Sequence, residues 1–176
     1  MSIPRSPFRR RSQSGQAAVE TALMVIPLLM LLLAIIDFSL AIFVMDTLEF
    51  AARQGVRYAV TGQVVTVPGT PPTVLGQDAS IRQQVRDAAL GLLNSVPDAN
   101  ITVNYYAYNQ ATSTWQPTAN NFGDNMVKVS VTGFSWLWIL PGSTWSTSRN
   151  GSNALSINVA SADIMEGCPG GVCPSR

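Results

Sequence analysis

The order of apolar and polar positions shows one long apolar segment near the start of the chain and a more mixed pattern after it. The apolar run begins at Ala22 and reaches Met45, and only Asp37 and Ser39 interrupt it seriously. A bilayer core of ~30 Å is crossed by ~20 helical residues. The pattern therefore predicts a transmembrane helix at about residues 22–45.

This helix is expected to continue beyond the membrane as an amphipathic stem. Over residues 46–60, apolar side chains recur every three or four positions and charged ones fall on another face. Glu49 and Arg53 form an i,i+4 pair of the favourable polarity, and Gly62 is a suitable terminator. A helix over 16–61 would be ~70 Å long, with its first part in lipid or a filament core and its second part against a globular head. The apolar positions are Leu48, Ala52, Val56 and Ala59, and the charged ones are Asp46, Glu49, Arg53 and Arg57.

A second helix is predicted after a connecting segment. Residues 63–76 are rich in Pro, Gly and Thr and indicate an exposed connection. The helix is expected from about Asp78 to Val96, with Asp78 or Ser80 as its N-cap and Pro97 after its end. Its apolar stripe consists of Ile81, Val85, Ala88, Ala89 and Leu92, and Arg82 and Arg86 are expected to face away from it.

Three later segments alternate apolar and polar residues and predict β-strands with one buried face. They cover about 101–106, 127–132 and 155–160, and the polar loop 109–125 suggests an antiparallel meander. The fold class is therefore α+β: a long transmembrane helix continues into a small head, where it and a second helix cover an antiparallel sheet of three or more strands. The inward-facing residues are Ile101, Val103, Tyr105, Val127, Val129, Val131, Leu155, Ile157 and Val159.

An apolar cluster lies just before Pro141-Gly142 and has three alternative interpretations. It can form part of the core or a buried edge, it can be a subunit interface, or it can contact the outer membrane leaflet, where Trp is favoured. The cluster consists of Phe134, Trp136, Leu137, Trp138, Ile139 and Leu140.

The distribution of charge predicts an orientation in the membrane. Hydrophobic residues make up 47% of the chain and charged residues 12%, against about a quarter charged in typical domains. Four arginines precede the apolar run, so the positive-inside rule places the N-terminus in the cytoplasm. We expect a basic cytoplasmic leader at 1–15, an N-terminal helix at 16–62 and an exported head at 63–176. A net charge of +1 gives no reason to expect a nucleic-acid partner. The arginines are Arg5, Arg9, Arg10 and Arg11.

The residue inventory predicts a protein that is not an enzyme and that holds no cofactor or metal. The chain has no His, which removes the commonest general base and the commonest metal ligand. Cys168 and Cys173 are the only cysteines, and a disulfide between them is the expectation for an exported domain. A thiol redox enzyme that uses this pair is an alternative, but the spacing is not that of Cys-x-x-Cys.

Three short motifs lie before, at the start of and after the apolar run. They read GQAAVE at 15–20, ALMVIPLL at 22–29 and AARQGVRYA at 51–59, with Asp37 late in the run. Together they resemble the TadE-like family, pilin-like proteins of the Tad/Flp pilus machinery. The resemblance covers roughly residues 13–60.

The resemblance implies a function for the residues at the start of the apolar run. In type IV pilin-like proteins a membrane aspartic peptidase cuts on the cytoplasmic side of this run, here between Gly15 and Gln16. Gly15 has no Cβ to obstruct the cut. Glu20 becomes the fifth mature residue, and it can pair with the new α-amine of a neighbouring subunit in apolar surroundings, where an unpaired charge is costly. Without the resemblance, Glu20 is a first-turn residue favoured by the helix macrodipole.

Two further residues of the run have alternative interpretations. Pro27 in a membrane span usually only kinks it, and the resemblance implies a shared structural bend. Asp37 lies ~26 Å of helical rise beyond Glu20 and is expected near the outer interface, although an intramembrane acid is by default a functional candidate.

The resulting expectation is a minor pilin or pseudopilin that takes part in assembling a Tad/Flp-type surface pilus for bacterial adhesion. Its expected partners are the major Flp-type pilin, other pilin-like subunits, the inner-membrane pilus platform and the prepilin peptidase. It is expected to cross the bacterial inner membrane once, with its head periplasmic or extracellular. The alternative is an uncut, signal-anchored periplasmic binding or interaction module.

Overall fold

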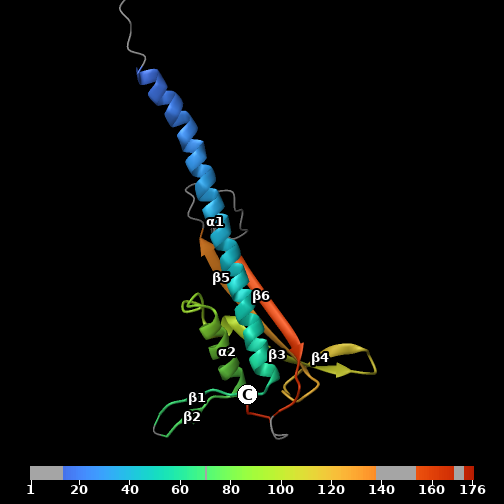
Figure 1. The fold of residues 1–176 in the computed structure, drawn as a ribbon. Coiled ribbons are helices and arrows are strands. Elements are labelled where there is room, and N and C mark those ends of the chain that lie inside the picture. The colour runs from blue at the N-terminus through green and yellow to red at the C-terminus, as the bar shows by residue number, and fades with distance from the viewer. Residues whose placement is uncertain (1–13, 70, 138–153, 169–172) are drawn as a thin grey trace, which may run out of the picture.

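The computed structural model describes residues 14–69, 71–137, 154–168 and 173–176, and it shows a long helical stem that runs into a small head (Figure 1). The elements are α1 (Ser14–Val60), β1 (Thr66–Val67), β2 (Thr73–Val74), α2 (Gln77–Ala88), the 3-10 turn η1 (Asp98–Asn100), β3 (Ile101–Asn109), β4 (Thr114–Thr118), β5 (Met126–Leu137) and β6 (Ala154–Ile164).

The stem is the single helix α1, close to the predicted bounds of 16–61. Pro27 lies inside it. Gly62 follows its end with φ of +62°, a backbone conformation that favours glycine, and its N–H donates to the carbonyl of Ala59 at 3.0 Å. The predicted apolar stripe of the second half is confirmed, since its four members are at most 3% exposed. They are Leu48, Ala52, Val56 and Ala59.

The head is built on a four-stranded antiparallel sheet in the order β4-β3-β5-β6. Strands β3, β5 and β6 correspond to the three predicted strands. The central pair is in a register that sets Val103 opposite Val129 and Tyr105 opposite Val127. The β1–β2 pair forms a separate two-stranded sheet, with exposed residues, in the predicted connection 63–76.

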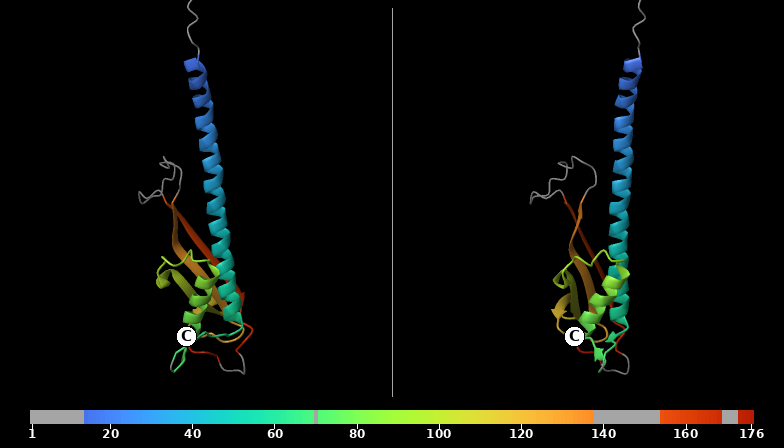
Figure 2. Two further views of the ribbon diagram at one scale, coloured as in Figure 1. Left: turned by 60° about the vertical axis from the view of Figure 1, so that its left-hand side comes forward. Right: turned by 90° about the vertical axis from the view of Figure 1, so that its left-hand side faces the viewer.

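Both helices lie on one face of this sheet (Figure 2). Helix α1 packs on β5 and β6, α2 packs on β3, and the two helices contact each other. This arrangement confirms the predicted α+β class. Eight of the nine predicted inward-facing strand residues are buried, whereas Leu155 is 40% exposed and that expectation was wrong. A register shift between Val131 and Phe134 separates the end of β5 that pairs with Leu155 from the part with regular pairing.

The loop predicted over 109–125 contains a strand. Residues of β4 pair with the second half of β3, so that Tyr108 lies opposite Trp115. Their rings meet edge to face with centroids 5.3 Å apart, a favourable cross-strand contact. The polar composition of β4, which is exposed except at Thr118, gave no apolar alternation to detect. The sheet is antiparallel as predicted but is not a simple meander, because β4 lies at the edge beside β3 and the chain crosses from β4 past β3 to reach β5.

Helix α2 ends at Ala88, eight residues before the predicted end. Leu90 and Gly91 have φ of +53° and +84°, outside the right-handed helical region, so the helix stops although its apolar stripe continues. Arg86 does not face away as expected. Its guanidinium donates to the carbonyls of Leu93 and Val96, the latter at 2.7 Å, and these bonds satisfy carbonyls of the non-helical turns.

The N-cap of α2 also differs from the prediction. The cap residue is Gly76, and no side chain caps the helix. Ser80 instead donates to the carbonyl of Gly76 at 2.9 Å and accepts the N–H of Val65 at 3.0 Å. Asp78 binds side chains outside the helix. Both residues therefore fix the start of α2 to other segments rather than capping it.

The apolar cluster after position 133 is only partly within the described residues. Phe134 and Trp136 are partly buried and pack against the core, which supports the core interpretation for these two. Leu137 is 70% exposed. Residues 138–140 lie outside the part that the structure describes.

Candidate functional site

The residues predicted for processing lie at the free beginning of α1. Gly15 and Gln16 are in its first turn and both are exposed. A Cβ placed on Gly15 would meet nothing within 4 Å. Packing in the folded chain therefore does not require a glycine at this position, and a substitution there would leave the described fold undisturbed.

Glu20 lies one helical turn beyond Gln16 on the same face of α1. The side chain of Gln16 donates to the Glu20 carboxylate at 3.2 Å, and both groups are exposed. The structure thus brings the predicted assembly carboxylate and the predicted new N-terminal residue together within one chain. Cleavage at Gly15–Gln16 and pairing with a neighbouring subunit both remain predictions.

The part of α1 that is clear of the head has the length of a membrane span. Every residue from Gly15 to Ile36 is exposed, and 22 helical residues rise ~33 Å, close to the ~30 Å of a bilayer core. Among the described residues, α1 is the one helix long and apolar enough to cross a membrane. Because this segment is exposed rather than packed in a core, it fits a single-pass membrane anchor. The predicted span of 22–45 overlaps the head-facing part of the stem.

Asp37 is the first buried residue of α1, at 2% exposed. It begins a stripe that continues at spacings of three and four through Ala41, Val44 and Leu48, all buried. This stripe is the side of the stem that faces the head. Asp37 therefore lies where the free part of the stem ends, and its place near the outer interface stays a prediction.

Gly55, in the middle of the AARQGVRYA motif, is a point of close approach between α1 and α2. A Cβ on Gly55 would meet the Val85 side chain at 2.4 Å, with Ile81 and Val129 each at 3.6 Å. Glycine thus lets the stem lie directly on α2 and β5. The motif quoted from the sequence contains this glycine, but its packing role was missed.

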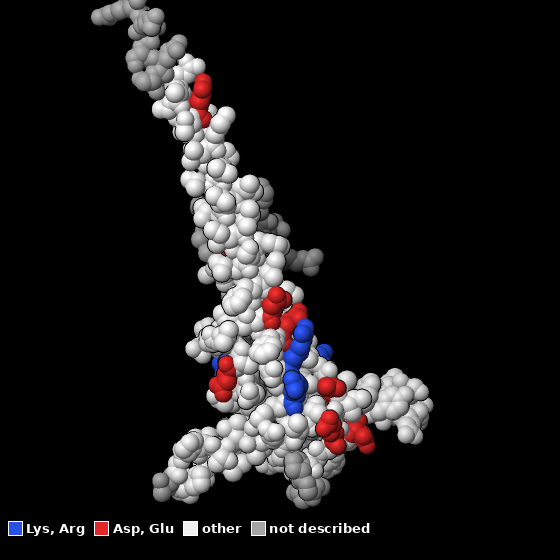
Figure 3. All heavy atoms as spheres, in the orientation of Figure 1, with Lys and Arg blue, Asp and Glu red and all other residues white. Residues whose placement is uncertain are grey.

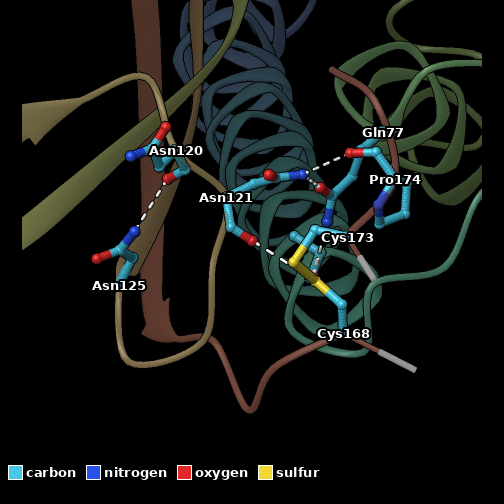
Figure 4. The surroundings of a disulfide bond; sticks show 8 residues. Gln77, Asn120, Asn121, Asn125, Cys168, Cys173 and Pro174 are labelled. Atoms are coloured by element: carbon cyan, nitrogen blue, oxygen red, sulfur yellow. Dashed lines mark hydrogen bonds between the residues drawn. A yellow bond between two sulfur atoms is a disulfide. The ribbon is translucent and has the colours of Figure 1, made fainter. Parts of the chain in front are cut away.

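The disulfide predicted from the sequence lies at the end of the head remote from the free stem. In the structure Cys168 and Cys173 are bonded, with Cα atoms 4.9 Å apart. Cys168 Sγ lies 3.7 Å from the carbonyl oxygen of Asn121, in the segment before β5 (Figure 4). The disulfide brings the last residues of the chain back toward α2.

A buried polar junction adjoins the disulfide, and sequence reasoning missed it (Figure 4). Asn121 donates through its amide to the Gln77 side chain and to the carbonyl of Pro174, the latter at 2.8 Å. The side-chain amide of the fully buried Gln77 donates to the carbonyl of Ala59 at 3.2 Å, and the backbone N–H of Gln77 donates to the carbonyl of Ser175 at 2.7 Å. Buried polar groups need such partners, so this junction ties together the end of the stem, the start of α2 and the tail.

The last residue, Arg176, completes the attachment of the tail. Its guanidinium pairs with Asp78 at 3.0 Å, donates to the carbonyl of Ala119 at 2.7 Å and lies 4.5 Å from the centroid of the Tyr105 ring. The Tyr105 hydroxyl donates to Asp78 at 3.0 Å. Burial, with a smaller contribution from the Asp78 carboxylate, raises the pKa of Tyr105 well above its usual value. Nothing in the sequence pattern relates these residues to one another.

The described residues contain no group of three or more His, Cys, Asp or Glu side chains that could hold a metal ion. What they present is a stem with a free apolar half and a second half embedded in an α+β head. This architecture defines a stem-and-head protein whose N-terminal helix fits a single-pass membrane anchor.

Comparison with known proteins finds one family model that matches part of the stem. The family model described as TadE-like protein matches residues 15–57, which lie entirely within α1. The match confirms the resemblance and points to a Tad pilus-associated protein. No curated protein and no solved structure matches the chain.

Proposed function

We propose that the chain is a minor pilin or pseudopilin that takes part in assembling a Tad/Flp-type surface pilus. The observation that carries the proposal is the stem: an exposed apolar segment from Gly15 to Ile36 is continuous with the part of α1 that packs in the core of the head. Such a stem can be held by a bilayer before assembly and by other apolar helices afterwards. The TadE-like match falls on this same helix.

In this proposal a prepilin peptidase removes the basic leader at Gly15–Gln16. The exposed first turn of α1 and the free space around Gly15 fit access by such an enzyme. Glu20 then serves as the partner of an N-terminal amine in an apolar environment. The membrane segment is the head-free part, residues 15–36, with the N-terminus in the cytoplasm and the head outside the inner membrane. The Flp-type pilin, other pilin-like subunits and the pilus platform are the proposed partners.

The proposal is tested by deleting the gene and counting surface pili by electron microscopy. Loss or strong reduction of pili, with recovery on re-expression of the wild-type chain, is the expected result. Normal piliation in the deletion strain would contradict the proposed function. The uncut, signal-anchored periplasmic module would then be the remaining interpretation.

A further inference from the structure

The side of α1 that faces away from the head carries an ordered set of charges. Five residues at spacings of four, three, four and four form this outer strip, with two aromatic residues beside it. The strip consists of Ile42, Asp46, Glu49, Arg53 and Arg57, and the aromatic residues are Phe43 and Phe50. Figure 3 shows acidic and then basic side chains following one another along the stem toward the end of the head.

The charges of the outer strip are separated along the stem by sign. Asp46 and Glu49 lie nearer the free apolar segment. Arg53 lies seven residues beyond Asp46, and Arg57 lies eight residues beyond Glu49, ~11 Å and ~12 Å by helical rise. Glu49 and Arg53 pair with each other at 2.9 Å. Asp46 and Arg57 make no ion pair with any residue in the described ranges. Because they are ~16 Å apart, well beyond the Debye length of ~8 Å at physiological salt, they act as separate charges.

The apolar residues beside these charges are not covered by the head. Phe43 is 56% exposed, Phe50 53% and Ile42 46%. Phe50 lies 14 residues beyond Ile36, ~21 Å past the end of the head-free segment. Lipid therefore does not reach it if the membrane holds residues 15–36. A strip that combines exposed aromatic side chains with ordered charges has the composition of a helix-pairing surface.

The charge order decides which partner fits. Two chains anchored by the same apolar segment lie at the same depth, so a second copy would place acidic groups against acidic groups and arginines against arginines. Like charges in direct opposition disfavour that pairing. A parallel helix with basic residues at the depth of Asp46 and Glu49, and acidic residues at the depth of Arg53 and Arg57, would pair along the whole strip.

We propose that the outer strip is the docking surface for the stem of a different membrane-anchored chain with the reverse, basic-then-acidic order of charges. The strip selects this partner and disfavours a second copy. The inference rests on the proposed function in that both chains are anchored in one membrane, and it adds the surface and the chemistry of the partner.

The experiment uses a charge-reversed copy of the full chain as the probe. The variant D46R/E49R/R53E/R57E has the reverse order at the same depth and keeps an i,i+4 pair between positions 49 and 53. The variant I42C is placed in both chains, one turn before position 46 on the strip, and a short bismaleimide cross-linker is added to membranes. An epitope inserted in the exposed β3–β4 turn of one chain distinguishes the dimers.

With the two chains at equal amounts, random pairing gives a twofold excess of heterodimers over either homodimer. The proposal expects at least about a sixfold excess at low salt, threefold above the random yield. This excess should fall in 1 M NaCl, where the Debye length is ~3 Å. Yields near the random ratio of 1:2:1, or homodimers of the wild-type chain as abundant as heterodimers, would overturn the proposal. A control pair of the wild-type chain and a chain that carries only E49R/R53E, which reverses the internal pair and leaves Asp46 and Arg57 in place, should show a smaller excess.

The natural partner is tested in cells with a photo-reactive phenylalanine analogue at position 50. Mass spectrometry of the cross-linked product should identify another single-pass chain with basic and then acidic residues after its apolar segment. A product with a second copy of this chain, or no product, would overturn the proposal. Because cross-linking does not depend on cleavage, a chain cut at Gln16 without this product would refute the docking surface alone. An uncut chain with the product would refute the pilin function alone.

Discussion

The guanidinium of Arg176, the last residue of the chain, pairs with the carboxylate of Asp78 at the start of α2 at 3.0 Å. The two residues are 98 positions apart, and their side chains are 32% and 17% exposed. The pair therefore attaches the C-terminus to the helix that packs against the stem. Through Gln77, the same end of α2 is hydrogen-bonded to the last turn of α1.

The first prediction concerns this attachment. R176A should lower the free energy of unfolding of the head by about 1–2 kcal/mol, because Asp78 loses a charged partner in a half-buried site. The measurement is urea unfolding of the detergent-solubilised chain. The matched control is R53A, whose exposed pair with Glu49 should contribute only about 0.3–0.5 kcal/mol. Equal effects of the two variants would contradict the role given to the tail.

The second prediction concerns the disulfide between Cys168 and Cys173. Alkylation of unreduced protein should leave Cys168 and Cys173 unlabelled, and reduction should expose two thiols, because the head is proposed to lie in an oxidising compartment. The variant C168S/C173S should cost no more than about 2 kcal/mol, since the closed loop is short. Free thiols in the native protein, or labelling only from the cytoplasmic side, would contradict the exported head.

Gly55 gives a third prediction, on the contact between stem and head. G55A should destabilise the head by about 1–3 kcal/mol, because the added Cβ must displace Val85 or move α1 from α2. G15A serves as the control, since a Cβ there meets nothing within 4 Å and should leave stability unchanged. Thermal unfolding followed by near-ultraviolet circular dichroism measures both. Wild-type stability in G55A would show that the helices are not closely packed at this point.

A fourth prediction separates the two interpretations of Glu20. E20Q should still insert in the membrane, because insertion depends on the apolar run, but pilus assembly should fail or weaken if the carboxylate pairs with a mature amine. The measurement is the number of pili on cells that express the variant, with membrane-fraction immunoblots as the check on insertion. Normal piliation would leave Glu20 as a residue favoured only by the helix dipole.

The stem and the central strands could be predicted because their periodicity is local. Leu48, Ala52, Val56 and Ala59 follow one helical face, and Val127, Val129 and Val131 alternate along a strand, so each short window contains the signal. The contacts on α1 also show why the apolar run alone does not separate lipid-facing from head-facing residues in the predicted span of 22–45. An apolar residue that faces the core and one that faces lipid look alike in sequence, and from Asp37 onward α1 carries residues that face the head.

The end of α2 and the polar junction could not be predicted for the opposite reason. Helix α2 stops because Leu90 and Gly91 adopt positive φ, while Arg86 binds the carbonyls of the following turns. The bond between Asn121 and Gln77 joins positions 44 residues apart. Such contacts depend on which segments meet in space, and no local pattern of apolar and polar residues encodes them.

The central claim, that the chain is processed and assembled as a pilin-like subunit, is tested most directly by the N-terminus of the mature protein. Mass spectrometry of membrane-extracted protein from cells with the active cognate peptidase should find the chain beginning at Gln16. G15V should block the cut, since a β-branched side chain crowds the scissile bond, while the open surroundings of Gly15 leave the fold intact. A wild-type chain that still begins at Met1 in the presence of the active peptidase would contradict the account.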